Sequence, residues 1–304
     1  AGVAVITVIC YLIGQTVKAS GLDNKWIPII VGASGGALGI SLGLGYAPEC
    51  FYTTQELIAA LAPLRDSGVP ITVHMRQEGA GVVEALKEML TVARALRTPV
   101  HISHLKSIGK AYWGRDMPEM LALPTHARED VLDVNCHTYP YTAGSTQLIH
   151  VLPPEAQEGG LDTLTQKLRV PEFRAAMRER MRTGTDFENL SLLVGWENID
   201  VSTVTREENR RFVGRSVAEI SAAEGVDPFD FTFDLLASES CAVTMIDRIT
   251  ANEDICAALR APFSSVISDA TYPTEGMPHP RVYGTFPRLI RHFVMEKHVL
   301  TLEQ

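Results

Sequence analysis

The sequence predicts an α/β fold, and one barrel domain covering residues 1–304 is the simplest form of it. Apolar, β-branched runs alternate with helix-period segments along the whole chain, which is the pattern of parallel sheets joined by crossover helices. With 46% hydrophobic residues, the chain can bury one large core. No repeat with a period of about 20 to 50 residues is present, so a solenoid is disfavoured.

In the first part of the chain, strands and helices are expected to alternate. A capping box formed by Thr53 and Glu56 predicts the start of a helix whose apolar face extends to Leu64. A second helix is expected over residues 82–96, where apolar side chains recur with helical spacing. The expected strands in this part lie at residues 3–9, 39–43, 70–74 and 99–104.

In the second part, helix-start signals are clearer than strand signals. Ser216 and Asp227 each precede an apolar periodic segment, and Pro228 occupies the first helical position after Asp227. Pro124 interrupts the helical pattern before Val131, so only a short helix is expected there. The composition of residues 279–288 is that of a loop. Further strands are expected at residues 131–139, 192–194 and 264–269.

Composition excludes several classes of protein. The net charge is −9, with 27 Lys and Arg against 36 Asp and Glu, so a nucleic-acid partner is disfavoured and a small-molecule substrate fits better. The 5 cysteines are scattered without a CxxC pair, which argues against a disulfide framework and predicts a reducing, cytoplasmic setting. No apolar run reaches the ~20 residues that span a membrane. The sequence leaves the oligomeric state open.

Two expected strands in succession end near a histidine, His74 and His104. The two residues are separated by 30 positions, about the length of one βα unit. In a (β/α)₈ barrel the carboxyl ends of neighbouring strands converge, so both imidazoles could bind one metal ion such as zinc. Spacing alone leaves open that they are two unrelated polar residues at strand ends.

Further candidates lie beyond the ends of expected strands. If the chain stays extended, Lys106 lies on the same side as His104, where an ammonium can neutralise a carboxylate. Asp269 ends a late apolar strand, which suits a proton-transfer residue, although an N-cap role is an equal alternative. Arg281 and Arg288 both suit carboxylate binding, and local chemistry does not rank them.

Five separated motifs resemble the D-aminoacylase (N-acyl-D-amino-acid deacylase) family, and they occur in the family's order. The likeness covers the chain from about Gly36 to its end. The motifs are HMRQEG at residues 74–79, PVHISHLKSIGKAYWG at 99–114, TYPYTAGST at 138–146, SDATY at 268–272 and HPRVYGTFPR at 279–288.

The resemblance implies a metal-dependent amidohydrolase barrel with one or two zinc ions that cleaves the amide bond of N-acyl-D-amino acids. It implies that His74 and His104 bind zinc and that Asp269 is the general base and acid. The residues that it places around the substrate carboxylate are Lys106, Tyr139, Ser145 and Arg281. The strand-face argument for Lys106 agrees with this assignment.

The departures from the family pattern also carry expectations. The family's first-strand HxH pair and its zinc-binding cysteine have no counterpart here, so we expect the barrel to be incomplete in this chain, lacking its opening strands and its C-terminal part. Ala270 stands where the family usually has glycine. Two alternatives stay open, a cyclic-amide hydrolase of the dihydroorotase or hydantoinase type and an inactive barrel fragment.

Overall fold

The computed structural model describes residues 39–271 and 275–302. The chain divides into two compact units. The first unit contains the described residues up to Arg76, Gly81–Ser103 and Glu119–His137, and the second contains Gln77–Ala80, His104–Pro118 and the described residues from Thr138 onward. The strand expected at residues 3–9 lies outside the described residues. The single catalytic domain over residues 1–304 stays a prediction.

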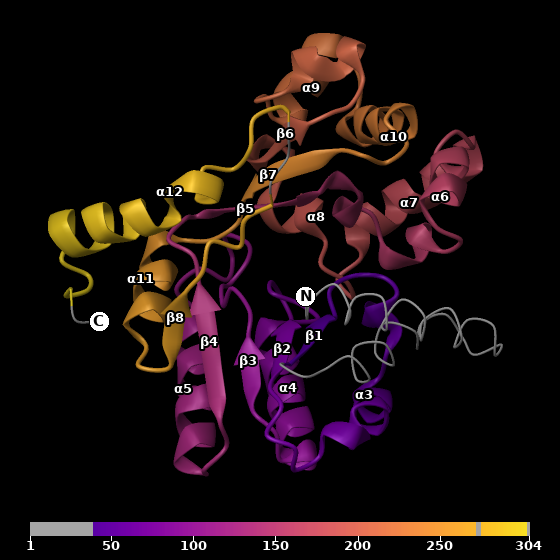
Figure 1. The fold of residues 1–304 in the computed structure, drawn as a ribbon. Helices are drawn as coiled ribbons and strands as arrows, with labels where there is room; N and C mark the ends of the chain where they lie inside the picture. Colours follow the sequence, from indigo (N-terminus) through magenta and orange to yellow (C-terminus); the bar gives the residue numbers. More distant parts are fainter. Residues whose placement is uncertain (1–38, 272–274, 303–304) are drawn as a thin grey trace, which may run out of the picture. The chain divides into compact units, whose positions relative to one another are not determined.

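Four strands of the first unit form a parallel sheet, which confirms the predicted α/β class (Figure 1). The pairing aligns Ile40 with Ile71, Ile71 with Val100, and Val100 with Val134, so these four residues share one face of the sheet. All four are buried, whereas Thr72, His101 and Asn135 on the other face are half-buried. The strands are β1 (Ile40–Gly43), β2 (Ile71–His74), β3 (Val100–Ile102) and β4 (Val134–Thr138).

The helices that join these strands begin largely where the sequence predicts. At the start of α3 the Thr53 side chain accepts from Glu56 N while Glu56 bonds back, so the capping box is confirmed. The prediction of only a short helix before Val131 is wrong, because α5 continues through Pro124. Met120 and Ala127, one on each side of Pro124, are fully buried, and this burial outweighs the local cost of proline. The helices are α3 (Thr54–Ala60), α4 (Val82–Leu96) and α5 (Met117–Glu129).

The second unit contains an antiparallel sheet with the order β5-β7-β6, which the sequence did not predict. The strand expected at residues 192–194 is wrong, since α8 (Leu190–Val194) begins there with the Asn189 side chain as its N-cap. A run of three apolar residues does not distinguish a strand from a helix by periodicity. The strands of this unit are β5 (Ala143–Gln147), β6 (Ile199–Thr203), β7 (Thr244–Arg248) and the short β8 (Ser264–Val266).

Two helix starts in the second unit are confirmed, at Ser216 with a full capping box and at Asp227 followed by Pro228. The loop expected at residues 279–288 is wrong, because Arg281–Arg288 forms α12. Arg281 and Thr285 lie one turn apart, both are buried, and Thr285 Oγ1 donates to Arg281 O. The other helices are α6 (Leu161–Lys167), α7 (Pro171–Thr183), α9 (Val217–Glu224), α10 (Pro228–Ser238), α11 (Asn252–Arg260) and the π-helix Leu289–Glu296.

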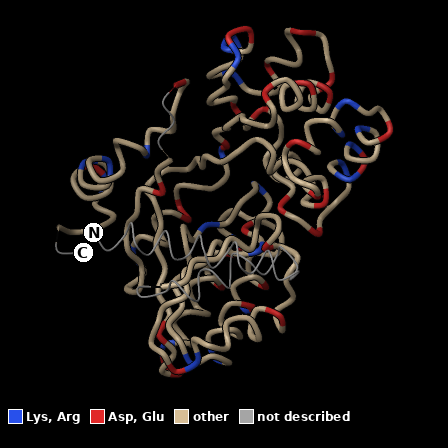
Figure 2. The backbone as a smooth tube through the Cα atoms, turned by 45° about the vertical axis from the view of Figure 1, so that its right-hand side comes forward, with Lys and Arg blue, Asp and Glu red and all other residues tan. Residues whose placement is uncertain are grey.

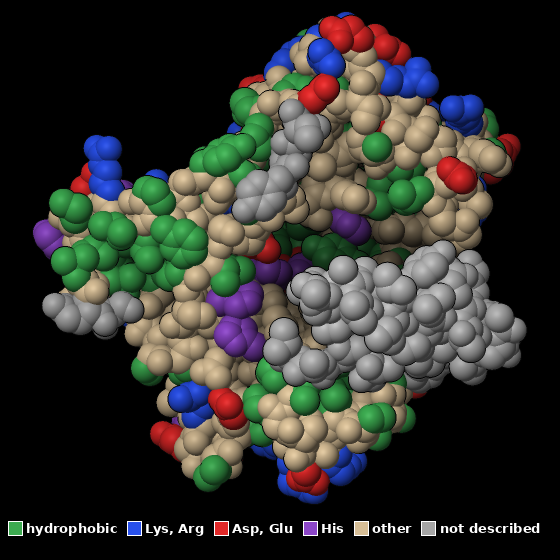
Figure 3. Space-filling model, viewed as in Figure 1, with side chains coloured by type: hydrophobic (Ala, Val, Ile, Leu, Met, Phe, Trp, Pro, Cys, Tyr) green, Lys and Arg blue, Asp and Glu red, His purple; other side chains and the backbone are tan. Residues whose placement is uncertain are grey.

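The described surface has mixed charge (Figure 2), and the face seen in Figure 3 carries an apolar patch. Lys and Arg are interspersed with Asp and Glu along the described backbone rather than gathered in one stripe (Figure 2). Exposed apolar side chains gather over α12 and the π-helix that follows it (Figure 3), among them Tyr283, Phe286, Ile290 and Met295. None of the described helices combines the length and the apolar character that a membrane crossing requires.

Candidate active site

His104 and Lys106 lie together just after β3, and both are buried in the second unit. The chain leaves β3 in a turn, with His104 at φ +36°. Lys106 Nζ lies 2.9 Å from His104 Nδ1. The expected proximity of these side chains is confirmed, although a turn rather than an extended strand produces it.

The carboxylate of Glu78, which the sequence analysis did not single out, joins the two side chains. Glu78 Oε1 lies 2.9 Å from His104 Nδ1, and Lys106 Nζ donates to Glu78 Oε2 at 2.6 Å. Burial lowers the pKa of Lys106, but the neighbouring carboxylate of Glu78 outweighs this effect, so the pKa lies above its usual range. Glu78 belongs to the HMRQEG motif, and an acidic residue between a strand and a helix was the signal available in the sequence.

A second carboxylate, that of the half-buried Glu188, bonds to the backbone at Glu78. Glu188 Oε2 accepts hydrogen bonds from the backbone N–H groups of Glu78 and Gly79. Burial raises the pKa of Glu188 to about 7. Its other oxygen, Oε1, has no hydrogen-bond partner among the described residues. Glu188 therefore uses only part of its hydrogen-bonding capacity within the described structure.

Tyr139 lies between two cations. The Arg281 guanidinium is 4.8 Å and the Lys106 ammonium 6.0 Å from the centre of the Tyr139 ring. Burial raises the pKa of Tyr139 to about 12, so its hydroxyl stays protonated at neutral pH and can donate a hydrogen bond.

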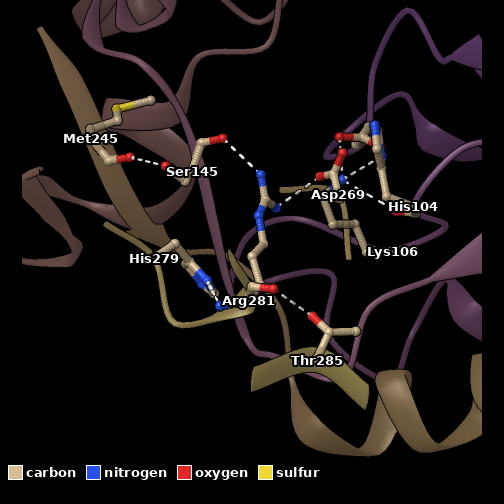
Figure 4. Close-up of polar contacts among 9 residues, drawn as sticks. His104, Lys106, Ser145, Met245, Asp269, His279, Arg281 and Thr285 are labelled. Carbon is tan, nitrogen blue, oxygen red and sulfur yellow. Dashed lines mark hydrogen bonds and ion pairs between the residues drawn. The ribbon is translucent and has the colours of Figure 1, made fainter. Parts of the chain in front are cut away.

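Arg281 links two further predicted site residues, Asp269 and Ser145. Arg281 Nη1 is 2.8 Å from Asp269 Oδ2, and Nη2 donates to Ser145 O at 3.0 Å. Figure 4 shows the guanidinium between Ser145 on one side and Asp269 on the other, with His104 and Lys106 beyond Asp269. The Ser145 hydroxyl itself donates to Met245 O at 2.9 Å. Asp269 caps none of the described helices, and its role stays a prediction.

Asp247 on β7 is a further residue that the sequence analysis missed. It is paired with Gly144 on β5, and a Cβ on Gly144 would lie 2.9 Å from Asp247 Oδ1 and 3.4 Å from Tyr139 Oη. Burial raises the pKa of Asp247 to about 6, against the lowering effect of Lys106 and Arg281. Asp247 Oδ1 has no hydrogen-bond partner among the described residues. An acid inside the apolar run MIDRI was the signal in the sequence.

His74, the other predicted zinc ligand, is the last residue of β2 and belongs to the first unit. Its ring stacks on Tyr46, with the ring centres 4.5 Å apart. Within the second unit, Glu78 and His104 are candidate metal donors.

The second unit thus brings six side chains into one cluster, which we call the site cluster: Glu78, His104, Lys106, Tyr139, Asp269 and Arg281. An imidazole and carboxylates suit a divalent metal ion, and zinc in particular accepts both donor types. Arg281 and Lys106 suit a carboxylate ligand. Asp269 offers a carboxylate for proton transfer.

The chain is similar in sequence to known D-amino-acid deacylases. No protein-family model matches the chain. By sequence the chain is 29% identical over 269 residues to D-aminoacylase of Alcaligenes xylosoxydans xylosoxydans, covering 88% of this chain and 45% of that protein. It is 28% identical over 270 residues to N-acyl-D-glutamate deacylase of the same organism, covering 88% and 45%. The chain therefore spans about half the length of these relatives.

Solved structures of D-aminoacylase are also similar to this chain. A crystal structure of D-aminoacylase, described as defining a novel subset of amidohydrolases, matches with a TM-score of 0.67 and 27% identity over 92% of this chain and 49% of that chain. Another D-aminoacylase structure, described by the functional role of its binuclear metal centre, matches with a TM-score of 0.67 and 27% identity over 93% and 50%. The family resemblance of the sequence motifs is confirmed.

Proposed function

Because the chain is related to the D-aminoacylases in sequence and in fold, we propose that this protein hydrolyses the amide bond of N-acyl-D-amino acids. The products are a carboxylate and a free D-amino acid. The observation that carries this proposal is the site cluster, in which an imidazole for a metal ion lies beside the ion pair of Asp269 with Arg281. One group of side chains thereby offers metal binding, proton transfer and carboxylate binding.

We propose that His104, together with His74, holds zinc. The donor chemistry fits, because His104 Nδ1 is engaged by its neighbours and the ring has a second nitrogen, Nε2, to offer a metal ion. A bound zinc ion supplies Lewis acidity, which polarises a carbonyl group and lowers the pKa of water. The number of zinc ions, one or two, depends on donors other than His74 and His104.

Arg281 and Lys106 are proposed to bind the carboxylate of the substrate. The Arg281 guanidinium is buried and its Nε has no hydrogen-bond partner among the described residues, so a donor is left for a ligand oxygen. Tyr139 adds a hydroxyl donor and packs against the same guanidinium. Ser145 is proposed to act here through its backbone carbonyl, which accepts from Arg281 Nη2 and so fixes the orientation of the guanidinium.

Asp269 is proposed as the general base and acid. Its carboxylate, held by Arg281 Nη1, takes a proton from the attacking water and later delivers a proton to the leaving amine nitrogen. The amide bond breaks, and the amine leaves as the free D-amino acid.

We also propose that the parallel strands are part of a (β/α)₈ barrel of the amidohydrolase kind, forming one catalytic domain. The parallel pairing of β1 to β4 and the position of His74 at the end of β2 support this arrangement. In such barrels the catalytic residues follow the carboxyl ends of the strands.

The test is release of free amine from matched N-acetyl-D- and N-acetyl-L-amino acids by the purified protein. We expect turnover of the D series, loss of turnover after chelation, and recovery when zinc is restored. The L substrates are the control, since they share every bond except the configuration at Cα. Equal or faster turnover of the L series, or full activity without metal, would reject the proposal.

A further inference from the structure

Two described side chains, Glu78 and Lys106, interact with the Nδ1 atom of His104 in opposite ways. Glu78 Oε1 and Lys106 Nζ both lie 2.9 Å from this nitrogen. A carboxylate can only accept a hydrogen bond and an ammonium can only donate one. When Nδ1 carries the proton, it donates to Glu78 and leaves Nε2 with a lone pair. When Nδ1 is bare, it accepts from Lys106, and the neutral ring then carries its proton on Nε2.

We propose that Glu78 is a positioning residue, which holds His104 in the tautomer with the proton on Nδ1 and thereby places the lone pair of the ring on Nε2, the nitrogen that binds a metal ion. This inference rests on the proposed function of His104 as a metal ligand. A neutral ring with its proton on Nδ1 has its lone pair on Nε2, so the competition between Glu78 and Lys106 decides whether Nε2 can bind a metal ion.

The contacts of Lys106 favour Glu78 in this competition. Lys106 Nζ has two further acceptors within reach, Glu78 Oε2 at 2.6 Å and His104 O at 3.3 Å. Two of its three N–H donors thus have acceptors other than Nδ1. The hydrogen bond from imidazole to carboxylate is also charge-assisted, and burial of all three side chains shields it from competing water.

The backbone around Glu78 is fixed, as a positioning role requires. Glu188 accepts from the N–H groups of Glu78 and Gly79, and Ile108 N donates to Glu78 O at 2.7 Å. A Cβ on Gly79 would lie 2.9 Å from Glu188 Oε1 and 2.7 Å from Leu193 Cδ1, so only glycine allows this close approach. Hydrogen bonds therefore hold both peptide groups that flank Glu78.

The experiment measures two quantities in metal-free protein labelled with ¹⁵N-histidine, the tautomer of His104 and the zinc dissociation constant by chelator competition. The His104 signal is assigned from its loss in His104→Gln. In the wild type we expect the Nδ1–H form. In Glu78→Ala we expect Lys106 to take over as the partner of Nδ1, so that the ring shifts to Nε2–H and the zinc dissociation constant rises by about 10- to 100-fold.

Two further variants separate positioning from a general loss of structure. In Glu78→Ala with Lys106→Met the competing donor is gone, so we expect the Nδ1–H population and part of the zinc affinity to return. Glu239→Gln is the matched control, because Glu239 is equally buried at 2% exposure and bonds to Thr205 and Asn209 instead. Its zinc dissociation constant should stay within about twofold of the wild type.

A wild-type His104 with its proton on Nε2 overturns the inference, and this reading does not depend on whether any variant folds. Unchanged zinc affinity in folded Glu78→Ala overturns it as well. Failure of the proposed function looks different, because a protein without D-specific amidase activity could still bind zinc in a Glu78-dependent way. An active deacylase with an Nε2–H His104 would contradict this inference alone.

Discussion

Two carboxylates of the second unit, Glu239 and Asp247, are almost equally buried, at 2% and 3% exposure, yet their surroundings differ. Glu239 follows α10 and accepts hydrogen bonds from both the backbone and the hydroxyl of Thr205, from Arg206 N and from Asn209 Nδ2. Asp247 has one oxygen without a partner among the described residues. Burial raises the pKa of both, but the hydrogen bonds to Glu239 outweigh it and leave that pKa lowered, whereas the pKa of Asp247 is raised to about 6.

The number of hydrogen-bond donors around the carboxylate distinguishes a structural acid such as Glu239 from one beside the candidate site, such as Asp247. A buried acid that only holds the fold together acquires enough donors to stabilise its charge. Asp247 and Glu188 lack this, and both interact electrostatically with Lys106 and Glu78. Buried ionisable groups with raised pKa values gather at functional sites. The comparison therefore supports the site cluster by a route independent of the sequence motifs.

The largest expected effect is on catalysis. Asp269→Asn keeps the shape of the side chain but removes its ability to accept and deliver a proton, so we expect kcat to fall by about 10² to 10⁴ with KM little changed. Steady-state kinetics on an N-acetyl-D-amino acid, with zinc content measured on the same sample, gives the answer. Glu239→Gln should retain normal kcat in its folded fraction. Near-normal turnover of zinc-replete Asp269→Asn would remove Asp269 from the mechanism.

A smaller effect is expected from Arg281→Lys. Lysine keeps the charge but cannot bond Asp269 and Ser145 O through one planar group, as Arg281 does with Nη1 and Nη2. We expect kcat/KM for the D-substrate to fall by about 10- to 100-fold, the value of one or two hydrogen bonds to a charged group. Arg210→Lys, at an exposed arginine paired with Glu275, is the control. Equal kinetics in both variants would show that Arg281 does not contact the substrate.

The fold itself was predictable where local signals were strong. The capping box at Thr53, the helix start at Ser216 and the strand that ends at His74 were confirmed at or near the predicted residues. The sheet β5-β7-β6 was missed because its strands, such as AGSTQ, do not alternate between apolar and polar residues. Its stability comes from pairing across about 100 positions of sequence, as in Ser145 with Ile246.

The site was predictable only in part, for a similar reason. Lys106 lies two residues from His104, so any regular backbone keeps them near each other, and the sequence motif was sufficient. Glu188 lies 110 positions from Glu78, and nothing in either segment indicates that they meet. The role of His74 as a second zinc ligand stays a prediction.

A stability measurement sharpens the comparison further. Glu239→Gln should lower the free energy of unfolding by about 2 to 3 kcal/mol at pH 7, because several donors lose a charged acceptor. The pKa of Glu239 is lowered by folding, so its contribution is present above the unfolded pKa and is lost as the pH falls through the folded pKa. Urea unfolding at pH 7 and in acid measures it. If the loss of unfolding free energy in Glu239→Gln were as large in acid as at pH 7, Glu239 would not stabilise the fold through its charged form.

The smallest predicted effect has the opposite sign. Folding raises the pKa of Asp247 from 3.8 to about 6. The stability that the protonated carboxyl contributes to the fold is therefore lost as the pH rises through about 6. Asp247→Asn removes the buried charge and should raise the free energy of unfolding by about 1 to 2 kcal/mol at pH 8, with little effect near pH 4. If Asp247→Asn instead destabilised the protein at pH 8, the ionised carboxylate would have to be stabilised by hydrogen-bond partners, contrary to this account.

The central claim is that the site cluster binds the catalytic metal, and anomalous diffraction at the zinc edge from zinc-loaded crystals tests it most directly. We expect a peak ~2.0 to 2.1 Å from Nε2 of His104, with Nδ1 of the same ring still donating to Glu78. Crystals of His104→Gln grown with zinc should lose that peak or show it greatly weakened. Zinc bound elsewhere in the wild type, with none at His104, would contradict the account.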